Sequence, residues 1–169
     1  DWFKGDKDAK AVLVEYSDFQ CPACAFYYNM VNSLEREIGK KMLFIYRHYP
    51  LSQHKNARLA AITAEAAGRQ RKFWEMNALL FENQKIWSDT NNARKIFTDY
   101  AKSLTLDMVK FEKDLDLQEV KDKVENDLKS GQALGVDATP TFYLNGKKLS
   151  NIESYEQFKQ IIEKEAEKT

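Results

Sequence analysis

The sequence is poor in the residues that build covalent scaffolds and tight loops. Its 169 residues include only two cysteines, three prolines and six glycines. A disulfide between Cys21 and Cys24 would close a four-residue loop, which removes little entropy from the unfolded chain. The cysteine content therefore excludes a disulfide-stabilised scaffold, and the spacing of the two cysteines must serve another purpose.

Net charge and long apolar runs are also absent. The chain has 26 basic and 26 acidic residues, so its charge gives no reason to expect binding to nucleic acid or to an anionic membrane. No apolar run reaches the length of a membrane span, and the early segment AVLV is too short for the core of a signal peptide. The chain begins at Asp1, which a removed export signal or a shortened chain would equally explain.

The apolar residues that are present suffice for the core of one domain, or of one domain with a large insertion. Residues 9–17, AKAVLVEYS, are predicted to form a buried strand, and residues 41–50, KMLFIYRHYP, a second strand. Between them, apolar residues recur at helical spacing from Pro22 to Gly39. This β-α-β unit predicts two parallel strands joined by a helix.

Residues 52–134 have the composition and periodicity of several helices. The segments NARLAAITAEAAG and KFWEMNALLFENQ are two of them, and the region contains no repeat. After Gly135 the strand pattern returns in TPTFYLNGKKLS. The dipeptide Asn145-Gly146 within it favours a type I′ turn, so a hairpin is predicted there.

A final helix is predicted to begin at Ser154, where Gln157 would complete a capping box. Strand patterns thus lie at both ends of the chain, and the two ends must pair to bury their strands. We predict an α/β fold in which residues 1–51 and 135–169 form one discontinuous domain. Residues 52–134 would then form an inserted helical domain.

The segment Cys-Pro-Ala-Cys lies where a strand ends and a helix begins. At the start of the helix the sulfur of Cys21 would lie beside free backbone N–H groups, which favour a thiolate. Pro22 suits the first helical position, which needs no N–H donor. Cys24 lies one turn later, so its sulfur can reach back to Cys21. The spacing predicts an exposed, acidic attacking thiol at Cys21 and a more buried resolving thiol at Cys24.

Two other interpretations of the cysteine pair are an inert structural pair and half of a zinc site. His48 and His54 would supply the remaining zinc ligands. However, the interval after Cys24 is long, His48 is expected on a strand, and Pro22 would stiffen the metal-binding turn. His54 lies near a predicted helix start and is expected to be a surface or capping residue. The strand-then-helix context favours a redox dithiol, so no metal site is predicted.

Glu15 lies in an otherwise apolar strand, six residues before Cys21. A single strand carboxylate usually faces solvent or lies on an edge strand. Alternatively, Glu15 is a buried acid with a raised pKa beneath the disulfide, where it can relay a proton to or from Cys24. The residues alone leave both interpretations open.

Pro140 opens the predicted strand after the helical region. A trans proline is tolerated as the first residue of a strand, and only about 5–6% of X–Pro bonds are cis. Alternatively, a cis bond turns the backbone of Thr139 toward the cysteines, where a substrate peptide can pair with it as an added strand.

Three segments together make the sequence similar to a known family. EYSDFQCPAC, FWEMNALLFENQ and GVDATPTFYLNGKKL resemble the DsbA-like branch of the thioredoxin superfamily, over roughly residues 8–165. The Cys-x-x-Cys motif alone is common, but its combination with Thr-Pro-Thr-Phe and a helical insertion of this size is specific. The resemblance implies a thioredoxin fold with an inserted helical domain.

The resemblance also implies roles for individual residues. Cys21 matches the nucleophilic cysteine and Cys24 the resolving cysteine, and Pro22 and Ala23 form the dipeptide that tunes them. Glu15 matches the buried acid of the family.

In the third segment, Pro140 matches the cis-proline, with Thr139 before it. The strongest oxidants of the family carry a histidine where this chain has Ala23. That imidazole helps to hold the thiolate, so its absence predicts a potential lower by tens of millivolts, at ~30 mV per pKa unit.

The implied activity is that of a bacterial, extracytoplasmic thiol:disulfide oxidoreductase. Its Cys21–Cys24 disulfide would be donated to cysteine-containing, folding exported proteins, and a membrane redox partner would reoxidise it. No bound cofactor would be needed, because the disulfide is the redox group. The alternatives are an isomerase or reductase with the same site, and a non-catalytic binding module.

Several aromatic residues fall in or beside the helical region. Tyr27, Tyr28, Phe73, Trp74 and Trp87 would be able to line a groove for unfolded substrates. Aromatic residues at helical spacing are more often part of the core, and we expect this for Phe73 and Trp74.

Overall fold

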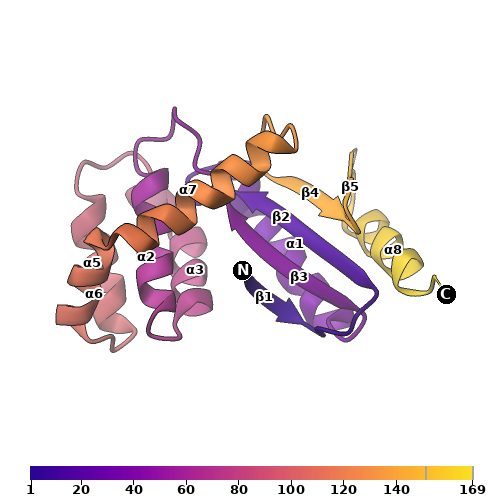
Figure 1. The fold of residues 1–169 in the computed structure, drawn as a ribbon, viewed down its shortest axis with the longest axis horizontal. Coiled ribbons are helices and arrows are strands. Elements are labelled where there is room, and N and C mark those ends of the chain that lie inside the picture. The colour runs from indigo at the N-terminus through magenta and orange to yellow at the C-terminus, as the bar shows by residue number, and fades with distance from the viewer. Residues whose placement is uncertain (151, 169) are drawn as a thin grey trace.

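The computed structural model describes residues 1–150 and 152–168, which form one mixed sheet with helices around it (Figure 1). The strands are β1 (Trp2–Gly5), β2 (Ala11–Ser17), β3 (Met42–His48), β4 (Thr141–Leu144) and β5 (Lys147–Lys148). The helices are α1 (Pro22–Ile38), α2 (Ala57–Gly68), α3 (Phe73–Glu82), α4 (Gln84–Trp87), α5 (Ala93–Ser103), α6 (Met108–Asp116), α7 (Gln118–Ala133) and α8 (Tyr155–Ala166). No helix of the described residues is both long enough and apolar enough to cross a membrane.

The sheet has the strand order β1-β3-β2-β4-β5, with β2 at its centre. β2 pairs in parallel with β3, where Leu13 lies opposite Phe44, and antiparallel with β4, where Leu13 lies opposite Leu144. The predicted parallel pair and the predicted pairing of the two ends of the chain are therefore confirmed. The α/β fold class follows from the same pairing.

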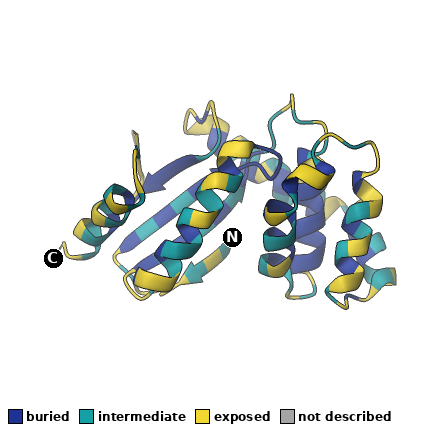
Figure 2. Ribbon diagram, turned by 180° about the vertical axis from the view of Figure 1, so that it is seen from behind, coloured by how far each residue is buried: buried dark blue, intermediate teal, exposed yellow. Residues whose placement is uncertain are grey.

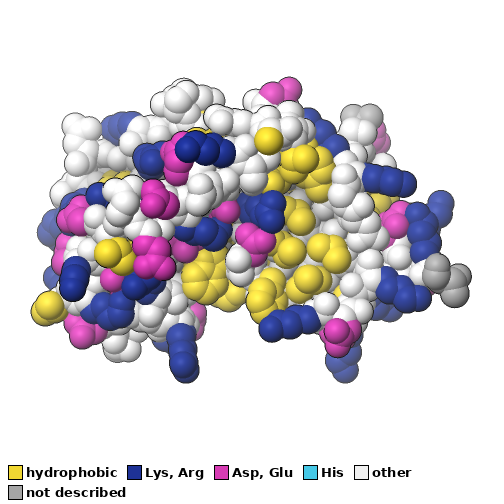
Figure 3. Space-filling view, in the orientation of Figure 1, with side chains coloured by type: hydrophobic (Ala, Val, Ile, Leu, Met, Phe, Trp, Pro, Cys, Tyr) yellow, Lys and Arg dark blue, Asp and Glu magenta, His cyan; other side chains and the backbone are white. Residues whose placement is uncertain are grey.

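The two faces of the sheet are covered unequally. α1 and α8 pack on one face of the sheet, the face toward the viewer in Figure 2, which is turned by 180° from Figure 1. On the opposite face, α7 contacts the end of β3. The parts of β2 and β3 that α7 does not cover carry half-buried side chains on this face, namely Val12, Val14, Leu43 and Ile45. Figure 3 shows hydrophobic side chains gathered over these strands. Buried and half-buried side chains thus alternate along β2 and β3, so that one face of the sheet is covered and the other is partly open.

The helices α2 to α7 follow β3 and precede β4, and most of them gather beside the sheet (Figure 1). The apolar core is continuous between the two parts, because the ring of Phe73 in α3 stacks on Trp2 of β1 at 4.4 Å between centroids. Phe73 and Trp87 are fully buried, which confirms the core assignment of Phe73. Trp74 is only partly buried and packs against this core. The domain boundaries at residues 52 and 134 stay a prediction.

The predicted hairpin and final helix are confirmed in detail. Asn145 and Gly146 both have positive φ, at 48° and 78°, as a type I′ turn requires. The side chain of Ser154 accepts a hydrogen bond from the backbone N–H of Gln157 at 3.2 Å. The side chain of Gln157 returns to the N–H of Glu153, one residue before the expected capping position.

The strand β1 was not predicted. It is a four-residue edge strand that pairs antiparallel with β3, with Trp2 opposite Tyr46. A strand this short leaves too few residues for an alternating pattern to be recognised. The indole of Trp2 also donates a hydrogen bond to Glu65 of α2 at 2.7 Å, which ties this edge to the helices.

Gly131 allows α7 to lie close to the sheet. A Cβ atom at this position would be 2.7 Å from the ring of Tyr49 and 2.9 Å from that of Tyr16. The neighbouring Ser130 hydroxyl is hydrogen-bonded to the Tyr16 hydroxyl at 2.9 Å. This contact fixes the end of α7, from which the chain continues directly to Thr139.

Candidate active site

The two cysteines lie at the beginning of α1, directly after β2 and a short loop. Cys21 is the N-cap residue, with extended backbone angles, and Pro22 is the first residue of the helix. Cys24 lies on the first turn and is completely buried, whereas Cys21 keeps 7% of its surface exposed. Cys21 is thus the more accessible thiol, as predicted, although it is less exposed than the sequence suggested.

The surroundings of Cys21 stabilise its thiolate. A hydrogen bond from the Cys24 thiol makes the largest contribution, and the backbone N–H groups of Ala23 and Cys24 add to it. Together they lower the pKa of Cys21 to about 5, against 9.0 for an unperturbed cysteine, even though burial acts in the opposite direction. The helix N-terminus therefore contributes as the sequence predicted, but the partner cysteine contributes more.

Cys24 has the opposite character. Burial raises the pKa of the Cys24 thiol well above its usual value, and its interaction with Cys21 and the charge of Glu15 raise it further. At neutral pH the reduced site therefore holds one thiolate, at Cys21, and one neutral thiol, at Cys24. Two thiols with pKa values moved apart in this way can take separate roles in thiol-disulfide exchange.

Glu15 is a buried acid and not a solvent-facing one. It lies in the middle strand β2 and is 3% exposed. Burial raises the pKa of Glu15 to about 7, and the charge of Cys21 contributes to the increase. Its own charge acts on Cys24 in turn. The geometry thus places a carboxyl group that titrates near neutral pH within electrostatic range of both cysteines.

The Thr139–Pro140 peptide bond is cis. The carbonyl oxygen of Thr139 lies 3.3 Å from the sulfur of Cys21 and accepts a hydrogen bond from it when the thiol is protonated. The structure therefore brings together the segment that contains Glu15, Cys21 and Cys24 and the distant Thr139–Pro140 bond.

Two residues at this site were missed by the sequence analysis. The side-chain amide of Gln84, at the start of α4, donates to the carbonyl oxygens of Phe19 at 2.7 Å and Cys21 at 2.9 Å. The backbone N–H of Asp18 donates to the sulfur of Cys24 at 3.4 Å. Both residues lie within segments that carry the family resemblance, Asp18 in EYSDFQCPAC and Gln84 at the end of FWEMNALLFENQ. Their contacts with the cysteine loop were not predicted, because they depend on backbone positions that only the folded chain defines.

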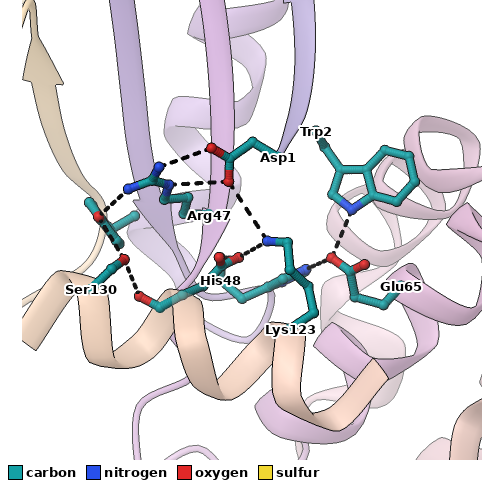
Figure 4. A network of polar contacts seen from close by, with 9 residues as sticks. Asp1, Trp2, Arg47, His48, Glu65, Lys123 and Ser130 are labelled. Carbon is teal, nitrogen blue, oxygen red and sulfur yellow. Dashed lines mark hydrogen bonds and ion pairs between the residues drawn. The ribbon is translucent and has the colours of Figure 1, made fainter. Parts of the chain in front are cut away.

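The two histidines of the zinc alternative both contact carboxylates. His48 ends β3, and its Nε2 lies 2.7 Å from Glu65 in the network shown in Figure 4. The Nδ1 of His54 lies 2.8 Å from Asp18. Among residues 1–150 and 152–168, no group of three or more His, Cys, Asp and Glu side chains is arranged to hold a metal ion.

The aromatic residues divide between the core and a groove. Tyr27 lines a groove of about 270 Å³ together with Pro140, Phe142 and Ile152. The hydroxyl of Tyr27 also donates to the carbonyl of Ile152 at 3.1 Å. Tyr28 instead stacks on the ring of Phe81 at 5.0 Å between centroids.

The cysteine pair lies at the start of a helix, beside a cis-proline and near a buried acid, and this arrangement is chemically capable of thiol-disulfide exchange. The family model described as thioredoxin matches residues 1–164, and the chain belongs to this family. Its structure is similar to solved structures that include BdbD and a DsbA protein.

Two solved structures illustrate this similarity. BdbD from Bacillus subtilis superposes with a TM-score of 0.84 and 29% sequence identity, over 98% of this chain and 92% of that one. The alpha-DsbA1 protein of Wolbachia pipientis superposes with a TM-score of 0.83 over 96% of this chain and 88% of its own, at 23% identity, and this likeness shows the fold alone. The thioredoxin fold implied by the sequence is confirmed.

Curated relatives of similar sequence are longer proteins. The Na⁺/H⁺ antiporter NhaA 1 of Mycobacterium sp. strain KMS is 34% identical over 153 residues, which are 88% of this chain and 24% of the antiporter. This chain therefore spans about a quarter of the length of the curated relatives that it matches.

We predict that the thiolate of Cys21 forms with a midpoint near pH 5, because hydrogen bonds to its sulfur stabilise the charge. The ultraviolet absorbance of the thiolate, followed against pH in the reduced protein, measures this midpoint, with the oxidised protein as the control. Cys24→Ala removes the largest stabilising contact and should raise the midpoint. A midpoint near 9 in the unaltered protein would contradict the assignment.

We also predict that Glu15→Gln stabilises the reduced protein in a pH-dependent way. The pKa of Glu15 is about 7 in the folded state and about 4.5 when unperturbed, so ionisation of this carboxyl group favours the unfolded state as pH rises through that interval. The gain in unfolding free energy from the substitution should be small below pH 4.5 and should grow by about 3 kcal/mol above pH 7.

Urea unfolding at several pH values measures this gain. Glu153→Gln is the matched control, because Glu153 is exposed. A gain that is the same at all pH values would mean that Glu15 is not protonated near neutral pH.

Proposed function

We propose that the chain is a dithiol oxidase that donates its Cys21–Cys24 disulfide to folding exported proteins. The observation that carries this proposal is the position of Cys21 at the start of α1, where the Cys24 thiol and the N–H groups of Ala23 and Cys24 lower its pKa to about 5. A stabilised thiolate stabilises the reduced protein at pH values above that pKa, and so makes the disulfide a stronger oxidant. At ~30 mV per pKa unit, a lowered pKa of the Cys21 thiol moves the equilibrium toward transfer of the Cys21–Cys24 disulfide to substrate thiols.

The reaction begins when a substrate thiolate attacks the sulfur of Cys21. The Cys21–Cys24 bond breaks, a mixed disulfide forms, and Cys24 leaves as a thiolate that takes up a proton. Glu15 can supply this proton, because its pKa of about 7 keeps part of it protonated at neutral pH. Its charge also opposes a persistent thiolate at Cys24.

A second substrate thiolate then attacks the substrate sulfur of the mixed disulfide. Cys21 leaves as the stabilised thiolate, and the substrate gains a disulfide. The substrate has lost two electrons and the protein has gained them, so both cysteines are reduced. The redox-active disulfide is the only redox group in this cycle, and no bound cofactor is required.

The substrate peptide is proposed to lie along the cis-proline segment. The backbone of Thr139 is next to Cys21, and an extended peptide can pair with such a segment as an added strand. The groove lined by Tyr27, Pro140 and Phe142 continues from this point. The groove is also lined by Asp137 and Lys148, but its apolar lining residues suit the apolar side chains of an unfolded protein. This supports cysteine-containing folding proteins as the substrates.

Reoxidation completes the proposed cycle. The reduced protein must pass two electrons to a partner, which we propose is a membrane redox protein in an oxidising, extracytoplasmic compartment of a bacterium. Disulfides persist in such compartments and are rare in the cytosol. This part of the proposal rests on the resemblance to the DsbA-like proteins.

The expected result is that the oxidised protein introduces disulfides into reduced, unfolded ribonuclease, and that Cys21→Ser abolishes this activity because the attacked sulfur is lost. Mass spectrometry of alkylated substrate counts the thiols that remain. Lys55→Ala, at a position away from both cysteines, is the control and should retain full activity. Retained oxidation by the Cys21→Ser variant would refute the mechanism.

Ribonuclease with scrambled disulfides distinguishes an oxidase from an isomerase. Reactivation of scrambled ribonuclease clearly above the thiol background would indicate an isomerase with this site instead of an oxidase. A Cys21–Cys24 disulfide that resists dithiothreitol would indicate a non-catalytic module.

A further inference from the structure

Asp18 lies three residues before Cys21, and its polar groups surround the cysteine pair. Its backbone N–H donates to the sulfur of Cys24 at 3.4 Å, and its carbonyl accepts from the N–H of Cys21 at 3.1 Å. One carboxylate oxygen accepts from the N–H of Gln20 at 2.7 Å. The Asp18 side chain is fully buried. This single residue therefore sets the conformation of the loop that leads into both cysteines.

The other carboxylate oxygen of Asp18 is held from a different part of the chain. It accepts from the backbone N–H of Leu51 at 2.8 Å and lies 2.8 Å from Nδ1 of His54. A buried carboxylate that accepts several hydrogen bonds is an acceptor only, so Nδ1 of His54 carries the hydrogen. The His54 side chain is 21% exposed. His54 thus covers Asp18 from the side of the solvent.

The contact between Asp18 and Cys24 matters when Cys24 leaves the disulfide. Burial raises the pKa of Cys24, whereas the backbone hydrogen bond from Asp18 lowers it. A thiol of lower pKa leaves a disulfide faster, and a donor aimed at the developing charge acts without rearrangement. The rate of exchange should therefore depend on how firmly the N–H of Asp18 is held.

We propose that His54 is a positioning residue for the exchange reaction. Its Nδ1–H fixes the carboxylate of Asp18, and the fixed Asp18 aims its backbone N–H at the sulfur of Cys24 as that sulfur becomes a thiolate. The imidazole of His54 is hydrogen-bonded to Asp18 and not to either cysteine. The inference deepens the proposed function and rests on exchange at Cys21–Cys24.

The test is the rate at which glutathione attacks the oxidised protein. His54→Ala should slow the attack about tenfold, the effect of weakening one hydrogen bond to a charged group. The equilibrium constant with glutathione should change by less than about twofold, since in the reduced protein Cys24 is a neutral thiol that gains little from the donor. A general loss of structure would not leave this equilibrium unchanged.

Two further substitutions define which atom of His54 acts. In His54→Asn the side-chain amide nitrogen can occupy nearly the same position as Nδ1 of the imidazole. In His54→Gln it lies one carbon farther from the backbone. His54→Asn should therefore recover the rate to within about threefold of the unaltered protein, and His54→Gln should remain slow. If His54→Ala does not fold, the comparison of Asn with Gln decides the question.

Lys55→Ala is the matched control. Lys55 also ties this segment to the helices, through the carbonyl of Asp89 at 2.7 Å and the side chain of Asn91 at 3.2 Å, but it does not contact Asp18. It should exchange at the normal rate. Equal rates for the three His54 variants and Lys55→Ala would overturn the role of His54 and leave the proposed function intact. If the unaltered protein does not exchange with glutathione, the proposed function is overturned as well.

Discussion

The stabilised thiolate of Cys21 is the interaction on which the chemistry of this protein depends. It requires a helix that begins at Cys21, with Pro22 as its first residue and the N–H groups of Ala23 and Cys24 directed at the sulfur. It also requires a neutral Cys24, because the thiol of Cys24 makes the strongest hydrogen bond to that thiolate. The burial that keeps Cys24 neutral therefore also makes Cys21 acidic.

The helical region contributes to this site as well as to the core. Gln84 holds the backbone carbonyl of Cys21 from α4, and His54 holds Asp18 from the segment before α2. On the opposite side, Gly131 lets α7 approach the sheet and fixes the end of the chain that leads to Thr139. The cysteine loop is thus held from both sides by parts of the chain outside the strands.

Much of this arrangement can be predicted from the sequence, since local patterns determine it. The β-α-β unit, the hairpin at Asn145-Gly146 and the position of the cysteines at a helix start follow from periodicity and turn chemistry. The burial of Glu15 and the cis bond at Pro140 were open from the residues alone and were favoured only by the family resemblance. The roles of Asp18 and Gln84 were not predicted, because their contacts with the cysteine loop depend on the folded backbone, and β1 was too short to show a pattern.

The most direct test of the account is the equilibrium reduction potential of the Cys21–Cys24 pair in glutathione buffers. The low pKa of Cys21 favours a strong oxidant, while the alanine at position 23 weakens it. The account therefore predicts a potential nearer to ~−120 mV than to ~−270 mV. A value near ~−270 mV would identify a reductant and would contradict the proposed direction of the reaction.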